Sequence, residues 1–426
     1  MAKYCDLEIN LNGSWQTCGK VKLLATESAG VSAPTSFEYA PSFLDQNEDL
    51  WGRHDRSAVS VRYPVSYELF NSPEWCPFLL DMIPSGAARR AWETRLALPN
   101  TPSSDWQLLC QGAGNPPGNV RVRTPDSEVP PVAHPGFNKS EIIKRQEEFI
   151  DYAYRAGAPV SGSSGAGGDA PKYLLRESQN GKWHSDGALP DSETKNFWIV
   201  KFPRGNRSKT DCLILKAEAS YYQVAAAFGI DVYGPLEWKE DCLFIPRFDR
   251  VKMGNKTLYQ GFESLYAAAG IAQFGANMSH EVLVEAIHKY SSNPEADVIE
   301  YVKRDVLNVA LGSTDNHARN TALLKLPDGT IRLAPLYDFA PMFLDPSGIR
   351  RSSRWQVEEG IGFPDWHKVL AHLIQKKILS AHSIKELKSL AVKVRKLPEL
   401  LTKFKTPAAV TEACVDRIAT VERMLK

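Results

Sequence analysis

Three polar side chains near the three-quarter mark of the chain have the types and order that phosphoryl transfer from ATP requires. Asp315 and Asn320 stand five residues apart, and Asp338 follows after an intervening apolar pattern. In such transfers one carboxylate faces the acceptor hydroxyl, while an amide oxygen and a second carboxylate hold Mg²⁺ against the phosphates. We therefore take Asp315, Asn320 and Asp338 as candidate catalytic residues, with Asn320 and Asp338 as the magnesium ligands.

The segments around these residues have patterns of elements that would hold them in place. Residues 321–325 and 330–334 are largely apolar runs, and the turn signal at 327–329 joins them. Upstream, Pro294 starts a helical pattern that Gly312 ends. The sequence thus predicts a helix, a catalytic loop, a β-hairpin and then the second aspartate, which is the order found in kinases.

A second set of candidates precedes this motif. The serine- and glycine-rich run 161–168 is either a flexible linker or a loop whose backbone amides cradle phosphates. Lys201 ends a buried-strand pattern, where it would hold the α and β phosphates or simply extend to solvent. Glu218, predicted in the first turn of a helix that ends at Gly229, would brace Lys201 or complement the helix dipole. Their order along the chain favours an ATP site.

The next strand pattern leads into Arg247 and Phe248, where a kinase hinge would contact adenine through its backbone. We expect His317 to pack against the catalytic loop rather than to transfer protons, because the chemistry needs no base besides Asp315. Arg319 would either screen charge on the transferred phosphoryl group or be an ordinary surface cation. The candidate nucleotide-binding residues are Ser163, Ser164, Gly165, Gly167, Gly168, Lys201, Glu218, Arg247, Phe248 and His317.

Composition limits the class of protein. The 426 residues are enough for about two to three domains. The 51 Lys and Arg nearly balance the 50 Asp and Glu, so the net charge predicts no overall electrostatic attraction to nucleic acid or membrane. The seven cysteines lack a C-x-x-C pair and are expected to be reduced thiols. No run approaches 18 apolar residues and no signal-peptide pattern is present, so we expect a cytoplasmic protein without membrane contact. The basic segment 376–405 is interpreted as a solvated face of terminal helices.

The amino-terminal region has a β-rich pattern. Apolar residues alternate from Leu7 to Leu11, and the Asn12-Gly13 signal that follows predicts a hairpin with a type I′ turn. Residues 119–122 form a further strand pattern. Ser140 is the predicted cap of a helix that Gly157 would stop.

Taken in order, these motifs resemble the HipA family of serine/threonine-protein kinase toxins over nearly the full length. The residues that carry the resemblance are the glycine-rich run, Lys201, Glu218, Arg247-Phe248-Asp249-Arg250, the Asp315 motif and Asp338, with Phe37-Glu38-Tyr39, Leu79–Pro84 and Trp106–Leu109 similar to that family's first subdomain. The resemblance implies an α+β, bilobal protein-kinase-like fold. It would comprise a β-rich amino-terminal subdomain (1–140), a kinase N-lobe with the glycine-rich loop (141–248) and a mainly helical C-lobe with the catalytic loop (249–426).

The resemblance also implies an activity and partners. It implies ATP- and Mg²⁺-dependent phosphorylation of a translation-related protein, in known cases an aminoacyl-tRNA synthetase, which arrests growth. It implies a helix-turn-helix, HipB-like antitoxin through which the complex would bind DNA indirectly. Several members autophosphorylate a serine of the glycine-rich loop, and the candidates here are Ser161, Ser163 and Ser164.

The sequence departs from the family pattern at two places, and it leaves two alternative functions open. Pro246 stands where such proteins often have Glu, and it keeps a carbonyl acceptor but has no amide hydrogen. The segment Arg350–Trp355 replaces the family's small apolar activation segment, so the resemblance does not fix the protein substrate. One rival is a small-molecule phosphotransferase of the aminoglycoside or choline kinase kind. The other is a catalytically dormant corepressor scaffold for a DNA-binding antitoxin.

Overall fold

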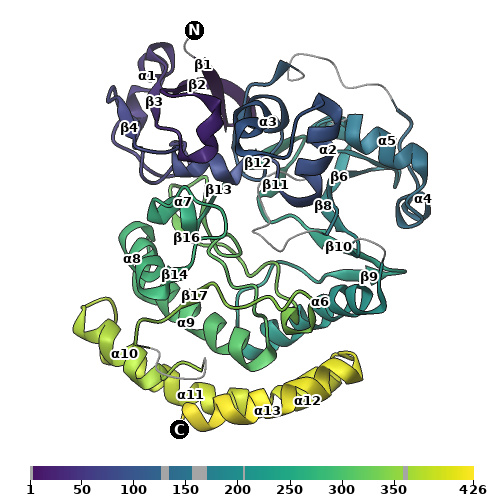
Figure 1. Cartoon of the computed structure of the whole chain (residues 1–426), viewed down its shortest axis with the longest axis vertical. Helices are drawn as coiled ribbons and strands as arrows, with labels where there is room; N and C mark the ends of the chain where they lie inside the picture. Colours follow the sequence, from purple (N-terminus) through teal and green to yellow (C-terminus); the bar gives the residue numbers. More distant parts are fainter. Residues whose placement is uncertain (1–2, 126–133, 156–169, 205–206, 358–362) are drawn as a thin grey trace. The chain divides into compact units, whose positions relative to one another are not determined.

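The first two strands form the hairpin that the sequence predicts. β1 (Lys3–Leu11) pairs antiparallel with β2 (Ser14–Leu23). Asn12 and Gly13 between them have φ values of 55° and 84°, as a type I′ turn requires. The computed structural model, drawn in Figure 1, describes residues 3–125, 134–155, 170–204, 207–357 and 363–426.

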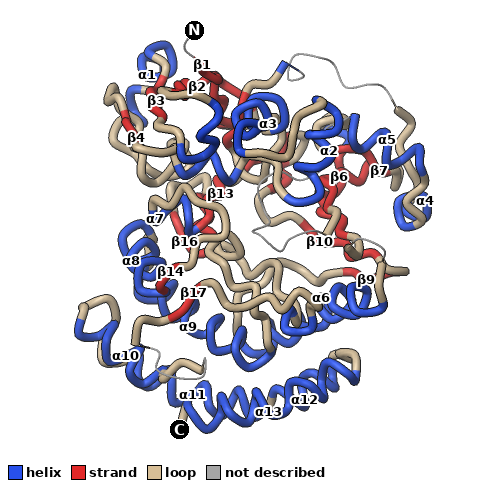
Figure 2. The backbone as a smooth tube through the Cα atoms, in the orientation of Figure 1, coloured by secondary structure: helices blue, strands red, loops and turns tan. Residues whose placement is uncertain are grey.

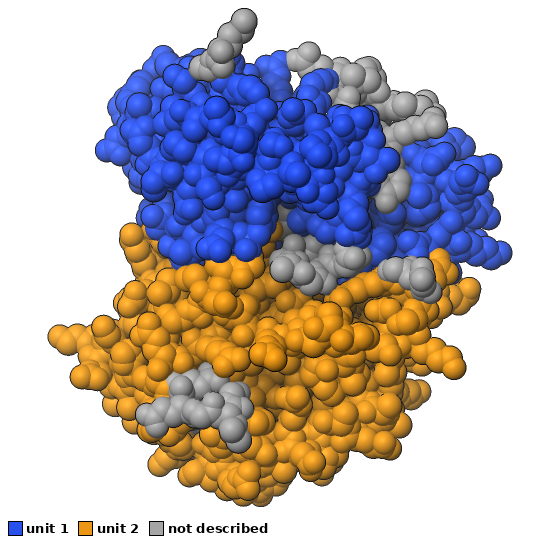
Figure 3. Space-filling view, in the orientation of Figure 1, with its two compact units in different colours: residues 1–202, 244–274, 322–331 blue, residues 203–243, 275–321, 332–426 orange. Residues whose placement is uncertain are grey.

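The chain folds into two compact units, coloured blue and orange in Figure 3, each built from three stretches of sequence. Unit 1 comprises Met1–Phe202, Phe244–Phe274 and Ala322–Ile331, and unit 2 comprises Pro203–Leu243, Gly275–Thr321 and Arg332–Lys426. Most strands belong to unit 1 and the long helices to unit 2 (Figure 2). The predicted α+β fold, β-rich toward the amino terminus and mainly helical toward the carboxy terminus, is confirmed. The three predicted domain boundaries stay a prediction.

The first sheet of unit 1 extends the hairpin on both sides, in the order β4-β3-β2-β1-β5. The predicted strand at 119–122 is β5, which pairs antiparallel with β1. The remaining elements of this part are β3 (Thr35–Tyr39), β4 (Phe70–Ser72), β5 (Val120–Val122), α1 (Pro41–Gln46), α2 (Gly86–Leu96), α3 (Asp105–Gly112) and short 3₁₀ helices at Glu27–Ser32, Glu48–Leu50, Pro77–Asp81 and Pro102–Ser104. Apolar side chains from the strands and the intervening loops form one buried core.

A second sheet of unit 1 carries the predicted lysine strand. In it, β8 (Thr194–Lys201) lies between β6 (Lys172–Ser178) and the Phe244–Pro246 end of β10 (Cys242–Pro246), and β7 (Trp183–Ser185) pairs with β6. The last elements of this unit are a 3₁₀ turn at Asp191–Glu193, β11 (Arg250–Met253), β12 (Lys256–Tyr259), β13 (Gly261–Ser264), α7 (Leu265–Ala269) and β15 (Ala322–Lys325). The predicted turn after β15 forms, since the Leu326 amide donates to the Thr330 carbonyl at 2.8 Å before β16 (Ile331–Leu333) begins.

The single helix predicted from Ser140 to Gly157 is wrong within the described residues. The chain forms α4 (Lys139–Ile143) and then α5 (Glu147–Arg155), and Asn138 rather than Ser140 is the N-cap. Asn138 and Glu141 form a capping box, which satisfies the first amides of α4. Arg145 has a φ of 51°, a left-handed conformation that no α-helix can contain, so the helix must break there. Gly157 lies outside the described residues.

Unit 2 is built around long helices. The predicted helix before the catalytic loop is α9 (Pro294–Leu311), and Gly312 with a φ of 66° caps it. The other elements are α6 (Lys209–Phe228), β9 (Glu237–Lys239), β14 (Met278–Ser279), α8 (His280–Tyr290), a 3₁₀ turn at Met342–Leu344, β17 (Ser353–Arg354), α10 (Trp366–Gln375), α11 (Ser383–Arg395), α12 (Leu397–Lys403) and α13 (Ala408–Met424).

Two further expectations concern the whole chain. All seven cysteines are free thiols, as expected for reduced cysteines. Across the residues that the structure describes, no helix has both the length and the apolar character needed to cross a membrane. In the basic segment, Lys385, Lys388 and Lys396 are exposed, which fits a solvated helix face.

Candidate active site

The loop that follows α9 fixes the spacing of the predicted catalytic motif. The Asn320 Nδ2 donates to the backbone carbonyl of Asp315 at 2.8 Å and so closes the loop. The end of α9 is held in turn, because the Tyr221 hydroxyl of α6 donates to the Leu311 carbonyl at 2.9 Å and the Phe343 amide donates to the Gly312 carbonyl at 3.1 Å. The motif therefore rests on a contact within its own loop and on contacts from two other segments of unit 2.

The Asn320 side chain presents a buried oxygen to the site. Asn320 is 9% exposed, and its Oδ1 has no hydrogen-bond partner among the described residues. Buried polar atoms are nearly always paired, so this oxygen is available to bind water or an ion. Asp338 lines the same pocket. An amide oxygen beside a carboxylate is a donor set that suits Mg²⁺ held partly by substrate phosphates, so the residues present fit this ion.

A site made of protein ligands alone is not found. Among the described residues, no group of three or more His, Cys, Asp or Glu side chains is placed to hold a metal ion. Magnesium in phosphoryl-transfer sites usually needs only one or two carboxylates, because the phosphates and water complete its coordination.

Asp338 occupies a constrained backbone position. Its φ is 54°, in the left-handed region that non-glycine residues rarely adopt. The residues on either side are fixed: the Tyr337 hydroxyl donates to the Arg319 carbonyl at 2.6 Å, and the buried Phe339 ring packs against Tyr221 at 5.3 Å between centroids. Strained residues of this kind persist where the surroundings determine them and are frequent at functional sites.

These residues share one pocket that lies entirely within unit 2. It measures about 420 Å³, its open mouth included. The pocket is lined by His280, Tyr301, Arg304, Asp305, Asn308, Ser313, Asp315, Asn316, Asn320, Thr321, Leu336, Tyr337, Asp338 and Phe339. The structure thus brings together Asp315, Asn320 and Asp338, which lie up to 23 positions apart in the sequence.

His317 and Arg319 lie inside the catalytic loop rather than on the surface. The His317 Nε2 is 3.4 Å from the Asp315 Oδ1, and both imidazole and carboxylate are largely buried. This contact fits the packing role that we predict for His317. Arg319 is 2% exposed, so its interpretation as an ordinary surface cation is wrong.

Glu218 lies halfway along α6, and its predicted place in the first turn is wrong. The helix begins earlier, because the Ser208 Oγ accepts from the Asp211 amide at 3.1 Å and caps it. At 1% exposure and far from the helix end, Glu218 has no role in complementing the dipole. The predicted helix end at Gly229 is confirmed.

Tyr222 is a site residue that the sequence analysis missed. Burial raises its pKa well above the usual value, and the nearby carboxylates of Glu218 and Asp338 raise it further. The Tyr222 hydroxyl is thus within electrostatic range of Glu218 on the same helix and of Asp338, the metal-binding candidate. The signal was available, because a tyrosine four residues after Glu218 lies on the same helix face.

The remaining nucleotide-binding candidates belong to unit 1 or lie outside the described residues. Lys201 ends β8 and is 6% exposed, whereas Glu218 belongs to unit 2, so the predicted pair stays a prediction. The loop candidates outside the described residues are Ser161, Ser163, Ser164, Gly165, Gly167 and Gly168.

The predicted hinge residues are fixed within unit 1. The Arg247 amide donates to the Phe197 carbonyl at 3.0 Å, and the Phe248 carbonyl accepts from the Gln260 Nε2 at 2.9 Å. The guanidinium of Arg247 is buried between Asp186 and Asp249, with which it forms ion pairs. The side chain of Arg247 thus forms structural ion pairs within the protein. Contact of adenine with Arg247 and Phe248 stays a prediction.

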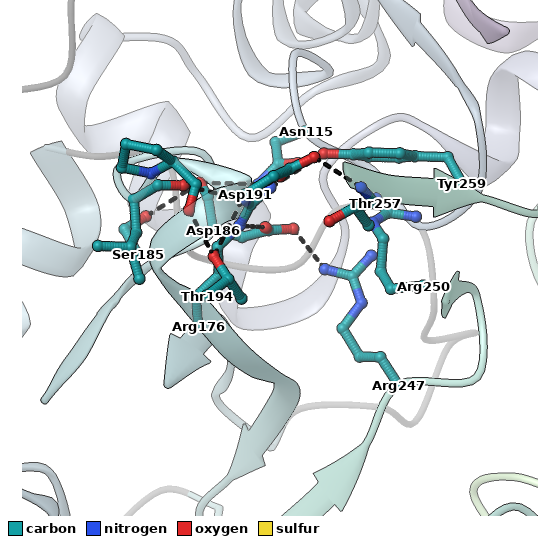
Figure 4. A network of polar contacts seen from close by, with 12 residues as sticks. Asn115, Arg176, Ser185, Asp186, Asp191, Thr194, Arg247, Arg250, Thr257 and Tyr259 are labelled. Atoms are coloured by element: carbon teal, nitrogen blue, oxygen red, sulfur yellow. Dashed lines mark hydrogen bonds and ion pairs between the residues drawn. The ribbon is translucent and has the colours of Figure 1, made fainter. Parts of the chain in front are cut away.

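Arg247 belongs to a buried ion-pair network shown in Figure 4. Arg176 donates through Nε to Asp186 at 2.7 Å and also contacts Asp191 and the Tyr259 hydroxyl. Arg250 donates to Asp249 at 2.7 Å, and Asp249 also accepts from the Arg247 guanidinium at 2.7 Å and from the Gly118 amide at 2.9 Å.

The arginines of this network lower the pKa values of its carboxylates. Burial alone would raise the pKa of Asp249, but Arg247 and Arg250 outweigh it and hold that pKa at about 2. In the same way Arg247 and Arg176 hold the pKa of Asp186 well below its usual range against the effect of burial. Both carboxylates are therefore ionised at neutral pH.

Comparison with known proteins identifies the family. The family described as HipA-like C-terminal domain matches residues 164–410, more than half of the chain, and the protein belongs to it. A curated relative, the putative kinase Y4dM of Sinorhizobium fredii, is 22% identical over 277 residues, which are 62% of this chain and 61% of the relative. The chain thus spans about three fifths of the length of the curated relative that it matches.

One solved structure supports the fold assignment. The HipA toxin of Shewanella oneidensis MR-1, solved with HipB and operator DNA, covers 98% of this chain and 95% of its own with a TM-score of 0.63 and 13% identity. At this identity the likeness shows the fold alone, and the predicted HipA-like fold is confirmed. The proinflammatory kinase CtkA of Helicobacter pylori matches 62% of this chain and 92% of its own at 13% identity, with a TM-score of 0.37 that is too low to carry an argument.

Proposed function

We propose that the protein transfers the γ-phosphoryl group of ATP to a serine or threonine hydroxyl of another protein. The observation that carries the proposal is the orphaned, buried Oδ1 of Asn320 in one pocket with Asp315 and Asp338. Asp315 would orient the acceptor hydroxyl and take its proton, and Asn320 with Asp338 would hold Mg²⁺. The ion, when bound, would neutralise charge on the phosphates.

The proposed nucleotide site also includes Lys201, Glu218 and the glycine-rich loop. Lys201 would hold the α and β phosphates with Glu218 bracing it, and backbone amides of residues 163–168 would cover the phosphates. These assignments rest on residue type and order together with family membership. The place of Lys201 at the end of β8 supports them, because kinases carry their phosphate-binding lysine on a strand.

Family membership and the HipA-like fold support a biological role as the toxin of a toxin–antitoxin pair. The neighbouring structure contains HipA, HipB and operator DNA. By analogy, we propose a helix-turn-helix antitoxin as partner here, with DNA reached through it. The proposed substrate is a translation-related protein such as an aminoacyl-tRNA synthetase, and growth arrest is the expected consequence of induction.

The metal assignment predicts a loss of Mg²⁺-dependent ATP binding. Asp338→Asn removes the negative charge of one proposed ligand, and Asn320→Leu removes the other ligand oxygen. Hydrogen bonds or contacts to a charged group contribute about 1.5–3 kcal/mol, or roughly 10- to 100-fold in affinity. We expect isothermal titration calorimetry to show this loss when Mg²⁺ is present and little difference between variants when it is chelated.

The control for this experiment is Asp416→Asn, which changes an exposed aspartate on α13. It should bind ATP and Mg²⁺ as the unmodified protein does. Equal affinity and equal metal dependence in the Asp338 and Asn320 variants would remove both residues from the proposed site.

Autophosphorylation is predicted at the glycine-rich loop. A phosphate on Ser161, Ser163 or Ser164 would add about −1.5 to −2 charges where the loop is proposed to receive the phosphates of ATP, so the modified protein should be inactive. Peptide mass spectrometry of protein purified from cells should find one added phosphate within residues 161–168. The Asp315→Asn variant should carry none; phosphate in both proteins would indicate another kinase, and phosphate in neither would contradict self-regulation through this loop.

A further inference from the structure

The segment Arg350–Trp355 is joined directly to the catalytic loop. The Asn316 Oδ1 accepts from the amides of Ser352 and Ser353, at 3.0 and 3.2 Å, and its Nδ2 donates to the Ser353 carbonyl at 2.9 Å. Asn316 directly follows Asp315, the proposed base. One side chain therefore ties the backbone of this segment to the residue next to the proposed reaction centre.

Further contacts hold the same segment on α8 and α9. Figure 1 shows β14 and β17 together beside these helices, and β14 pairs in parallel with β17. Asp305 of α9 accepts from the Arg351 guanidinium and from the Trp355 Nε1, both at 2.8 Å. The buried Trp355 ring stacks on His280 at 4.7 Å between centroids. The backbone of the segment is thus fixed from both sides.

Two arginines of this segment have no such structural task. Arg350 and Arg354 are exposed, and among the described residues no carboxylate lies within ion-pair distance of either. The guanidinium of Arg354 makes only a long contact of 3.5 Å with the Arg351 carbonyl. Arg351, in contrast, is engaged by Asp305. Within the part of the chain that the structure describes, this backbone therefore presents two guanidinium groups without a carboxylate partner, and such a surface is suited to carboxylates.

The position of these arginines limits which part of a substrate they reach. Arg354 directly follows Ser353, whose amide is bonded to Asn316, and consecutive Cα atoms lie about 3.8 Å apart. An extended substrate advances about 3.3–3.6 Å per residue. A substrate with its hydroxyl at Asp315 would therefore bring side chains within about four residues of that hydroxyl near Arg350 and Arg354.

We infer that Arg350 and Arg354 select acceptor serines or threonines that have acidic side chains within about four residues. The inference rests on the proposed protein kinase function and adds its substrate class: a linear segment with Asp or Glu near the phosphorylated residue. Exposed ion pairs contribute about 0.2–1 kcal/mol each, so the two arginines together should favour an acidic neighbour about 2- to 30-fold in kcat/KM.

A positional peptide library with a central Ser or Thr tests the inference. The unmodified protein, Arg350→Glu/Arg354→Glu and the control Lys388→Glu are each incubated with the library, ATP and Mg²⁺, and products are read by mass spectrometry. We expect enrichment of Asp and Glu in the unmodified protein and the control. The double variant should lose this preference or turn to Lys and Arg, with its ATP affinity unchanged in calorimetry.

The outcomes separate the inference from the function on which it rests. Phosphorylated peptides without acidic enrichment, or with enrichment that survives the double variant, overturn the inference and leave the kinase function intact. Mg²⁺-dependent ATP binding without any peptide product also overturns it, because a preference for linear acidic segments must act on peptides. Absence of both ATP binding and transfer contradicts the proposed function itself.

Discussion

Replacing Asp315 by Asn is expected to abolish phosphoryl transfer and to leave ATP binding largely unchanged. Loss of a positioned general base lowers rates by about 10²- to 10⁴-fold. The fold of the loop should survive, because Asn320 donates to the backbone carbonyl of Asp315 and not to its carboxylate. An Asn side chain also keeps an oxygen for the 3.4 Å contact with His317.

Transfer is measured by mass spectrometry of substrate and of the protein itself, and ATP binding by calorimetry. If induction of the unmodified gene arrests growth, induction of Asp315→Asn should not, while Asp416→Asn should remain toxic. A variant as toxic as the unmodified protein would favour the dormant-scaffold alternative, since toxicity would then not need catalysis. Transfer to small molecules but to no protein would favour the small-molecule phosphotransferase.

The parts of the site that the sequence predicted are those with local signals. Gly229 and Gly312 end helices in left-handed conformations, and Asn12-Gly13 forms its turn, because few other residues adopt positive φ at low cost. Asp315, Asn320 and Asp338 share a pocket because only a short loop and one hairpin separate them. Short connections leave few ways to arrange the flanking residues.

The errors came from competing local signals. The structure caps α4 at Asn138 and not at the predicted Ser140, because Asn138 and Glu141 have the spacing of a capping box. Ser208 and Asp211 mark the true start of α6, and overlooking them misplaced Glu218 by two turns or more. Both signals were present in the sequence, and both compete with other plausible caps nearby.

The contacts that the sequence could not indicate join residues far apart in the chain. Asp186 meets Arg247 across 61 positions, and Gly118 meets Asp249 across 131. Arg247 was interpreted only as a hinge residue, because nothing local distinguishes an arginine that binds a carboxylate in the core from one that contacts a ligand. Long-range polar pairing depends on the tertiary fold and has no periodic signature.

Breaking the buried network at Asp186 should strongly destabilise unit 1. Asp186→Asn leaves the guanidinium groups of Arg176 and Arg247 without their shared carboxylate, and removal of one partner of a buried ion pair costs about 3–5 kcal/mol. In hydrogen–deuterium exchange, β6 and β8 should exchange at least about 100-fold faster than in the unmodified protein, since each 1.4 kcal/mol is a factor of ten.

The matched control is Glu38→Gln, which removes the exposed ion pair with Lys20 in the same unit. Exposed pairs contribute about 0–1 kcal/mol, so exchange in this variant should change less than about fivefold. Similar exchange in Asp186→Asn and Glu38→Gln would show that the network does not stabilise unit 1.

Lowering the pH should destabilise the unmodified protein through the same ion-pair network. The pKa of Asp249 is held at about 2 and that of Asp186 below its usual range, whereas the unfolded chain protonates aspartates near about 3.9. Folded-state pKa values below unfolded ones give stability that is complete above about pH 4 and is lost as the pH falls toward 2. Unfolding monitored between pH 5 and 2 should therefore show a steep loss of stability. Asp186→Asn should show a shallower one, because that carboxylate no longer takes up a proton on unfolding; equal slopes would contradict the assignment of acid sensitivity to Asp186.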